Sequence, residues 1–285
     1  STPLYLSPLN NAVQMKDRAK IDLIIQNESF DKVKSLLKNS IFDLVRPTYE
    51  NIELFKLLIK LNDDDVNIYD DNNSSLLMRS VYNDDSSFIN EILENKNFDS
   101  KKSNLVEAFD LSFKLNRHYD LLFEFDQNHD HLIDLNELMP NGCSYFTSIK
   151  NEFSTKVDFL LQNGADPNIP DKNGIYPLEY AFYISEKQFI SSLLNTGKID
   201  LTKQIEIKNI RIISKCEFDE NSQKKISKST FSKDINPLIK SNSKSATYIH
   251  LAVLSQPQIL QLFLSNGKFD INAKDNEGET PLMFA

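Results

Sequence analysis

The chain has 285 residues, of which 40% are apolar and 26% charged, so it can bury a sizeable core and is not a disordered tail. Its net charge of −9 excludes the positive field that draws proteins to nucleic acid, and no apolar run is long enough for membrane insertion. Two cysteines, Cys143 and Cys216, exclude a disulfide framework and favour a cytoplasmic, intracellular setting.

A six-residue frame recurs along the chain. It has a small hydroxyl residue first, an apolar residue third and a small or apolar residue sixth. The frames begin at Ser7, Ser40, Ser75, Ser103, Ser144, Tyr176, Thr247 and Thr280. Successive starts lie 33, 35, 28, 41, 32, 71 and 33 residues apart, near the period of about 33 to 34 residues that marks helical repeat arrays. Because one such repeat cannot bury its own apolar face, we expect the units to stack.

Each frame is predicted to begin a helix. A Ser or Thr at its first place can accept a hydrogen bond from a free backbone N–H group. Proline at the second place suits the first helical turn because it has no N–H group to leave unpaired, and it occurs at Pro8, Pro177 and Pro281.

A second amphipathic helix is predicted shortly after most frames. Apolar residues at i, i+3 and i+4 occur within 21–25, 52–58, 88–93, 157–161, 189–194 and 259–264. Gly164, Gly197 and Gly267 follow three of these segments, and a residue that tolerates positive φ ends a helix there.

Polar connectors join the second helix of one unit to the next frame. Segments 65–73, 166–174 and 270–278 match one another closely, with Asn73 replacing the glycine found at the end of the other two. Asn and Gly both accept tight-turn geometry, so these connectors are predicted to be projecting β-turn fingers.

Together these segments resemble an ankyrin-repeat array. The Asp-x-x-Gly-x-Thr-Pro-Leu run at 275–282 and the Gly-Ala-Asp-Pro-Asn run at 164–168 are similar to the most characteristic segments of that family. The family's usual His at the fourth frame place occurs only at His250, so the repeats are divergent. The resemblance implies an all-α solenoid of stacked helix-turn-helix units with projecting β-turn fingers, in which His250 is structural.

Three segments are predicted along the chain. Residues 1–200 form an ankyrin array of about six repeats, the first partial or capping, and 247–285 hold further repeats, the last truncated. Residues 201–246 carry ten basic and five acidic side chains, which leaves −14 on the remainder. This Ser- and Lys-rich segment is either an inserted loop or ribbon or a degenerate repeat. The missing initial Met and the end inside a frame predict a piece of a longer array.

Residues 126–137 place oxygen-bearing side chains at positions 1, 3, 5, 9 and 12, as in a calcium-binding EF-hand loop. However, His131 stands where that loop requires Gly, and Pro140 prevents an exiting helix. Residues 134–136 also align with 270–272, so an acidic finger is the favoured interpretation and a calcium-responsive module the lesser alternative. The nearby His129 and Cys143 lack a recognised zinc spacing.

The sequence predicts no catalytic residue, no metal site and no cofactor. Its six glycines are dispersed, so no phosphate-binding loop is present. Cys143 and His250 have scaffold positions in the repeat, and the acidic pairs lie in connectors where carboxylates are normally solvated.

A stack of helix pairs with fingers offers a long surface that suits a macromolecule better than a small substrate. The resemblance likewise implies a non-enzymatic protein-interaction scaffold, and the −14 charge predicts a partner with a basic patch. The predicted contacts are the fingertips and the first-helix face: Tyr69, Asn72, Lys172, Asn173, Tyr180, Tyr183, Lys274, Asn276, Glu277 and Phe284. The alternative is a regulatory ankyrin arm of a larger enzyme or channel.

Overall fold

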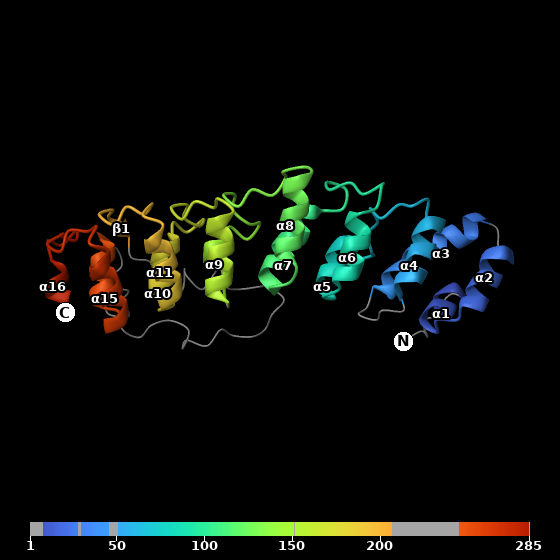
Figure 1. Ribbon diagram of the computed structural model, residues 1–285, viewed down its shortest axis with the longest axis horizontal. Coiled ribbons are helices and arrows are strands. Elements are labelled where there is room, and N and C mark those ends of the chain that lie inside the picture. Colours follow the sequence, from blue (N-terminus) through green and yellow to red (C-terminus); the bar gives the residue numbers. More distant parts are fainter. Residues whose placement is uncertain (1–7, 28–29, 46–50, 151, 207–244, 285) are drawn as a thin grey trace. The chain divides into compact units, whose positions relative to one another are not determined.

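The computed structural model of the protein describes residues 8–27, 30–45, 51–150, 152–206 and 245–284. Short α-helices dominate the described residues and stand side by side in pairs (Figure 1). The chain divides into two compact units, Ser1–Ile133 and Asp134–Ala285. The predicted all-α class with stacked helix-turn-helix units is confirmed within each of them.

The first unit contains four helix pairs. They are α1 (Pro8–Gln14) with α2 (Arg18–Asn27), α3 (Phe30–Leu44) with α4 (Asn51–Leu61), α5 (Leu76–Tyr82) with α6 (Ser86–Leu93), and α7 (Leu105–Leu115) with α8 (Tyr119–Asn128). The first helices pack together, α1 on α3 and α5 on α7. In the second-helix row, the rings of Phe55 and Phe88 meet edge to face with centroids 4.8 Å apart. Neighbouring repeats therefore share one apolar core.

The second unit continues the same plan. Its elements are the 3₁₀ turn η1 (Phe146–Ser148), α9 (Phe153–Gln162), α10 (Pro177–Tyr183), α11 (Lys187–Asn195), β1 (Ile205–Glu206), β2 (Ser245–Ala246), α14 (Tyr248–Val253), α15 (Pro257–Asn266) and α16 (Pro281–Phe284). Helix α10 packs between η1 and α14, and α11 packs between α9 and α15. First and second helices thus form two parallel rows within this unit.

The predicted helix starts are confirmed where the frame is most complete. Ser75 caps α5 and accepts a hydrogen bond from the backbone N–H of Met78 at 3.1 Å. Tyr176 and Thr247 directly precede α10 and α14. Buried His250 accepts from the Thr247 backbone N–H through Nδ1 at 3.2 Å, which leaves Nε2 to donate to the Glu279 carbonyl at 3.2 Å. His250 therefore has the structural role that the resemblance implied.

Three frames do not begin an α-helix, and Ser7 lies outside the described residues. Ser40 is inside α3, because Leu37, Ile41 and Leu44 continue one buried stripe through it without a break. Ser103 donates to the Asn67 side chain at 2.7 Å, and α7 begins two residues later. The frame at Ser144 forms only the single turn η1.

The second helices occur at all six predicted segments, as α2, α4, α6, α9, α11 and α15. Helix α8 (Tyr119–Asn128) was not predicted. Its buried residues are Tyr119, Leu122, Phe123 and Asp126, so an acidic residue interrupts the apolar stripe that would have identified it.

The fingers are confirmed, and an aspartate braces each of three. The Asp70 carboxylate accepts from the backbone N–H groups of residues 72 and 74, both at 2.9 Å. Asp171 accepts from residues 173 and 175 at 2.8 and 3.0 Å, and Asp275 from residues 277 and 279 at 2.9 and 2.7 Å. Asn73 has a φ of 59°, against 75° and 83° for the matching glycines. It therefore replaces glycine in the left-handed turn position.

Segment 201–246 begins and ends in a short antiparallel pair. Ile205 of β1 faces Ala246 of β2, and Glu206 faces Ser245. Ala246 directly precedes the α14 frame, as residues 175 and 279 precede theirs in the ordinary fingers. The pair therefore occupies the place of a finger base. Residues 207–244, over which the two interpretations differ, lie outside the described residues.

Candidate functional site

The fingers of the second unit are linked to one another by hydrogen bonds. The Lys172 backbone N–H donates to the Gly142 carbonyl at 2.8 Å, and the Lys172 side chain lies against Gly142 so closely that a Cβ there would collide with it. Further along, Asn276 exchanges two 3.0 Å hydrogen bonds with the Ser245 backbone. Neighbouring fingers in this row are therefore joined at two places.

Asparagine side chains join each connector to the next repeat. The Asn67 carbonyl oxygen accepts from the Asp99 backbone N–H at 2.8 Å, and its amide donates to the Asn97 carbonyl at 2.7 Å. In the second unit, Asn136 accepts from the Asp166 N–H at 2.8 Å, and Asn168 donates to the Lys198 carbonyl at 3.3 Å. This ladder holds successive connectors at a fixed spacing. The sequence does not reveal this ladder, because the hydrogen-bond partners lie about one repeat away along the chain.

Most of the predicted fingertip residues are exposed to solvent. The exposed ones are Asn72, Lys172, Lys274, Asn276 and Glu277, while Asn173 and Phe284 are partly buried. Phe284 packs edge to face on the His250 ring with centroids 5.2 Å apart. The finger row therefore presents polar side chains to solvent from a rigid base.

Two predicted aromatic anchors are unavailable at the surface, so this part of the prediction is wrong. Tyr180 and Tyr183 are 2% and 1% exposed. The Tyr180 hydroxyl donates to the Ile149 carbonyl at 3.1 Å, and the Tyr183 hydroxyl donates to the buried Glu179 carboxylate. Their helix α10 is buried along its whole length, because neighbouring elements cover all its sides. Both tyrosines are core residues.

Tyr69 also differs from its predicted role as a free fingertip. Its hydroxyl donates to the Lys102 carbonyl and lies 2.8 Å from the Asn104 side-chain oxygen, so it bridges two repeats. Removal of the ring from solvent raises the pKa of this hydroxyl. Tyr69 therefore stabilises the stack.

The calcium-loop alternative loses its first ligand. Asp126 lies in the last turn of α8 and is fully buried. Its carboxylate accepts from the Leu132 and Ile133 backbone N–H groups at 2.8 and 2.9 Å. Asp130 instead accepts from the Ser100 hydroxyl. These two carboxylates brace a turn and a neighbouring repeat.

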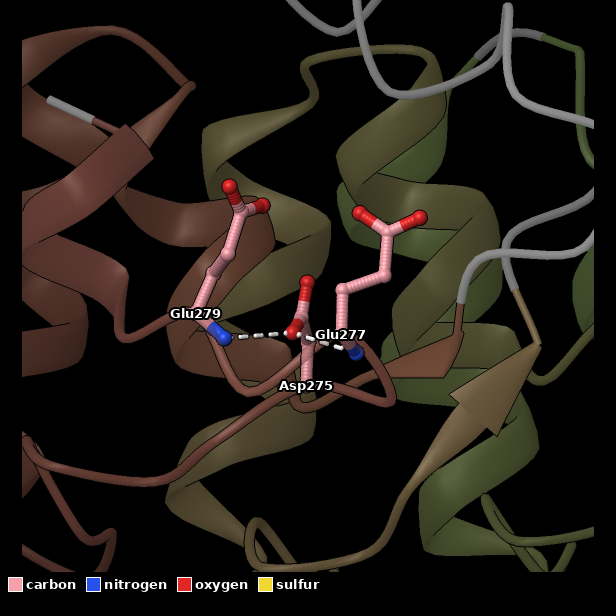
Figure 2. A group of neighbouring side chains, drawn as sticks. All are labelled: Asp275, Glu277 and Glu279. Atoms are coloured by element: carbon pink, nitrogen blue, oxygen red, sulfur yellow. Dashed lines mark hydrogen bonds between the residues drawn. The ribbon is translucent and has the colours of Figure 1, made fainter.

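In the described part of the chain, one cluster of three carboxylates is compact enough to suggest a cation-binding site. Asp275, Glu277 and Glu279 place one oxygen each within 4.8 Å of one another. Figure 2 shows Asp275 receiving the two backbone N–H groups, with the glutamate side chains extending on either side of it. Asp70 and Asp171 make the same pair of bonds, although neither has an acidic residue at the positions that match Glu277 and Glu279. The finger turn accounts for this geometry.

Chemically unusual groups are few among the described residues. Lys156 of α9 is 1% exposed, and burial lowers the pKa of its ammonium group to about 8. A surface hollow of about 500 Å³ lies between two connectors and is lined by Asp65, Asn67, Lys96, Asn97, Phe98, Asp99 and Lys102. Its polar residues already form the asparagine ladder and local ion pairs. No helix in the described residues is long and apolar enough to cross a membrane.

No protein-family model matches the chain, and no curated protein does. Among solved structures it is similar to the crystal structure of EF0377, an ankyrin repeat protein, with 18% sequence identity and a TM-score of 0.49. That match covers 66% of this chain and 96% of the other. The helix pairs, the braced fingers and the asparagine ladder of this chain are the features that identify its repeat fold.

Proposed function

We propose that the chain is a non-enzymatic, intracellular scaffold that binds a protein partner through its exposed fingertips. The observation that carries this proposal is the shared aspartate brace of the fingers at 70–74, 171–175 and 275–279. A surface that is already ordered loses less conformational entropy on binding than a flexible loop. The intracellular setting rests on the two cysteines.

The contacting residues in this proposal are the exposed fingertips. Asn72 lies in the first unit, and the second unit contains Lys172, Lys274, Asn276 and Glu277. Phe284 adds a partly exposed aromatic ring. These side chains combine hydrogen-bonding groups with both charges, which suits a polar protein surface.

The partner in this proposal carries a basic patch. The residues outside 201–246 have a net charge of −14, although many of their carboxylates already pair locally, such as Asp64 with Lys96 at 2.7 Å. Long-range attraction depends on the net charge and is screened by salt. Association should therefore slow as salt rises, and faster association at high salt would contradict the charge assignment.

The test compares two double variants of the full chain by proximity labelling in cells, followed by binding measurements with the purified partner. Lys274→Ala with Glu277→Ala removes two exposed fingertips without changing the net charge. Lys187→Ala with Gln188→Ala alters exposed positions on α11 instead. We expect the fingertip variant to lose at least tenfold in affinity while the α11 variant keeps wild-type affinity. Equal binding by both variants would overturn the proposal.

A further inference from the structure

Asparagine precedes glycine at four places in the chain, 141–142, 163–164, 173–174 and 266–267. Such a pair can modify itself, because glycine has no side chain to hinder attack by its backbone nitrogen on the preceding side-chain amide. A bond forms between that nitrogen and the asparagine Cγ, the bond from Cγ to Nδ2 breaks, and the backbone proton leaves with the amide as ammonia. Water then opens the cyclic imide to aspartate or isoaspartate. The glycine N–H must therefore be free to react.

In two fingers the glycine N–H is held by the turn. Gly142 donates to the Met139 carbonyl at 2.7 Å. Gly174 donates to the Asp171 carbonyl at 2.9 Å, and the Asn173 N–H donates to the Asp171 carboxylate at 2.8 Å. Attack on the amide would break these short hydrogen bonds, so both finger pairs are protected.

The pair that ends α9 is also restrained. The Asn163 amide donates to the Phe159 carbonyl of its own helix at 2.8 Å. The Gly164 N–H donates to the Leu161 carbonyl at 3.4 Å, a longer hydrogen bond than those in the fingers. Both reacting groups of this pair are therefore held, although Asn163 is exposed.

The pair that ends α15 stands at the position that matches Asn163, but its reacting groups are less restrained. Gly267 has a φ of 68°, and its N–H has no hydrogen-bond partner among the described residues. The Asn266 amide donates to the Leu194 carbonyl of α11 at 3.4 Å, near the upper limit for a hydrogen bond. The attacking nitrogen and the amide that it attacks are consequently freer here than in the other three pairs.

We propose that Asn266 is a site of spontaneous deamidation, in which water is the second reactant, and that the product loosens α15 from α11. The amide donates to the Leu194 carbonyl, whereas the carboxylate of the product only accepts hydrogen bonds and repels that oxygen. The product also places a negative charge at the last residue of a helix, where the macrodipole disfavours it. Since α11 and α15 pack on each other, both effects act on one contact between repeats. The site is not a fingertip, so the proposal is independent of the proposed function.

The first experiment incubates the full chain in mildly alkaline buffer and follows aspartate and isoaspartate at each site by peptide mapping. We expect Asn266 to react at least tenfold faster than Asn141 and Asn173, and faster than Asn163. Exposure alone predicts the opposite order for the last two, because Asn163 is exposed and Asn266 partly buried. Faster reaction at Asn163 would overturn the proposal. In urea the four sites should react at similar rates, and an undiminished lead of Asn266 there would show that its sequence context, not the fold, sets the rate.

The second experiment measures what the product does to the fold. Asn266→Asp mimics the aspartate product, and Asn163→Asp adds the same charge at the end of α9, where the original amide contacts only its own helix. We expect Asn266→Asp to accelerate hydrogen exchange in α11 at least twofold and Asn163→Asp to leave it unchanged. Equal exchange of α11 in the two variants would show that the modification does not loosen this contact.

Discussion

Asp171 is 4% exposed at the base of a finger, where its carboxylate accepts two backbone N–H groups. Asp70 and Asp275 do the same in their own fingers. A buried carboxylate is tolerated there because hydrogen bonds to the charged form replace its lost hydration. Some of the acidic residues are therefore structural, and the net charge overstates the number of carboxylates that a partner can contact.

Lys156 is a buried cation, and burial lowers the pKa of its ammonium group from 10.5 to about 8. Below pH 8 the folded protein must hold the charged form in a poorly hydrated site, whereas the unfolded chain holds it in water. The unfolded state binds more protons between pH 8 and 10.5, so stability should rise across that window. The largest difference corresponds to about 3 kcal/mol.

We expect Lys156→Met to raise the free energy of unfolding at pH 7 by about 2 kcal/mol and to reduce its gain between pH 8 and 10. Urea unfolding at several pH values measures both quantities. Lys187→Met, at an exposed position on α11, should keep the wild-type pH profile. A Lys156→Met profile that stays parallel to the wild type would show that Lys156 does not titrate as assigned.

At the scale of single elements, the sequence predicted the fingers and second helices better than the first helices. A finger depends on residues close together in the sequence, because Asp171 and Gly174 form hydrogen bonds within the same turn. The helix start predicted at Ser40 was wrong, because a six-residue pattern does not show that the buried stripe of α3 begins before it. The prediction that Tyr180 lies at the surface was wrong, because neighbouring repeats bury it and the residue spacing within one repeat does not show this.

The elements on either side of the segment between α11 and α14 pack directly on each other. Helix α11 packs directly on α15, and Phe182 of α10 contacts Tyr248 and Phe263 of the next pair at centroid distances of 6.5 and 5.9 Å. No helix pair lies between them in the described residues. Since Ile205 and Ala246 pair where a finger base stands, we propose that 207–244 is an insertion at a fingertip.

Replacement of 207–244 by Asn-Gly tests this proposal, because a two-residue turn of that type joins antiparallel strands. We expect the thermal midpoint to stay within about 3 °C of the wild type, since the surrounding core is untouched. Ile205→Asp, at a residue 2% exposed, should lower it clearly by comparison. A shortened chain that loses several kcal/mol of stability would instead identify 207–244 as a repeat whose core has been removed.

At the scale of the molecule, each compact unit contains large apolar side chains that are fully buried. In the second unit, Phe182 is fully buried between two helix pairs. In the first, Phe113 is fully buried and its ring lies 5.3 Å from that of Tyr119. In stacked repeats the stabilising contacts come from nearest neighbours, so the effect of a local defect decreases with distance along the stack.

Phe182→Ala should therefore destabilise the second unit by about 3 to 5 kcal/mol, because it removes a large buried ring and leaves a cavity. Hydrogen exchange should accelerate in α10, α11, α14 and α15, and α5 to α8 should keep their protection within about 0.5 kcal/mol. Phe113→Ala should give the reverse pattern, with faster exchange in α5 to α8. If either substitution accelerates exchange equally in both units, the chain unfolds as one cooperative block, and the nearest-neighbour account of its stability is wrong.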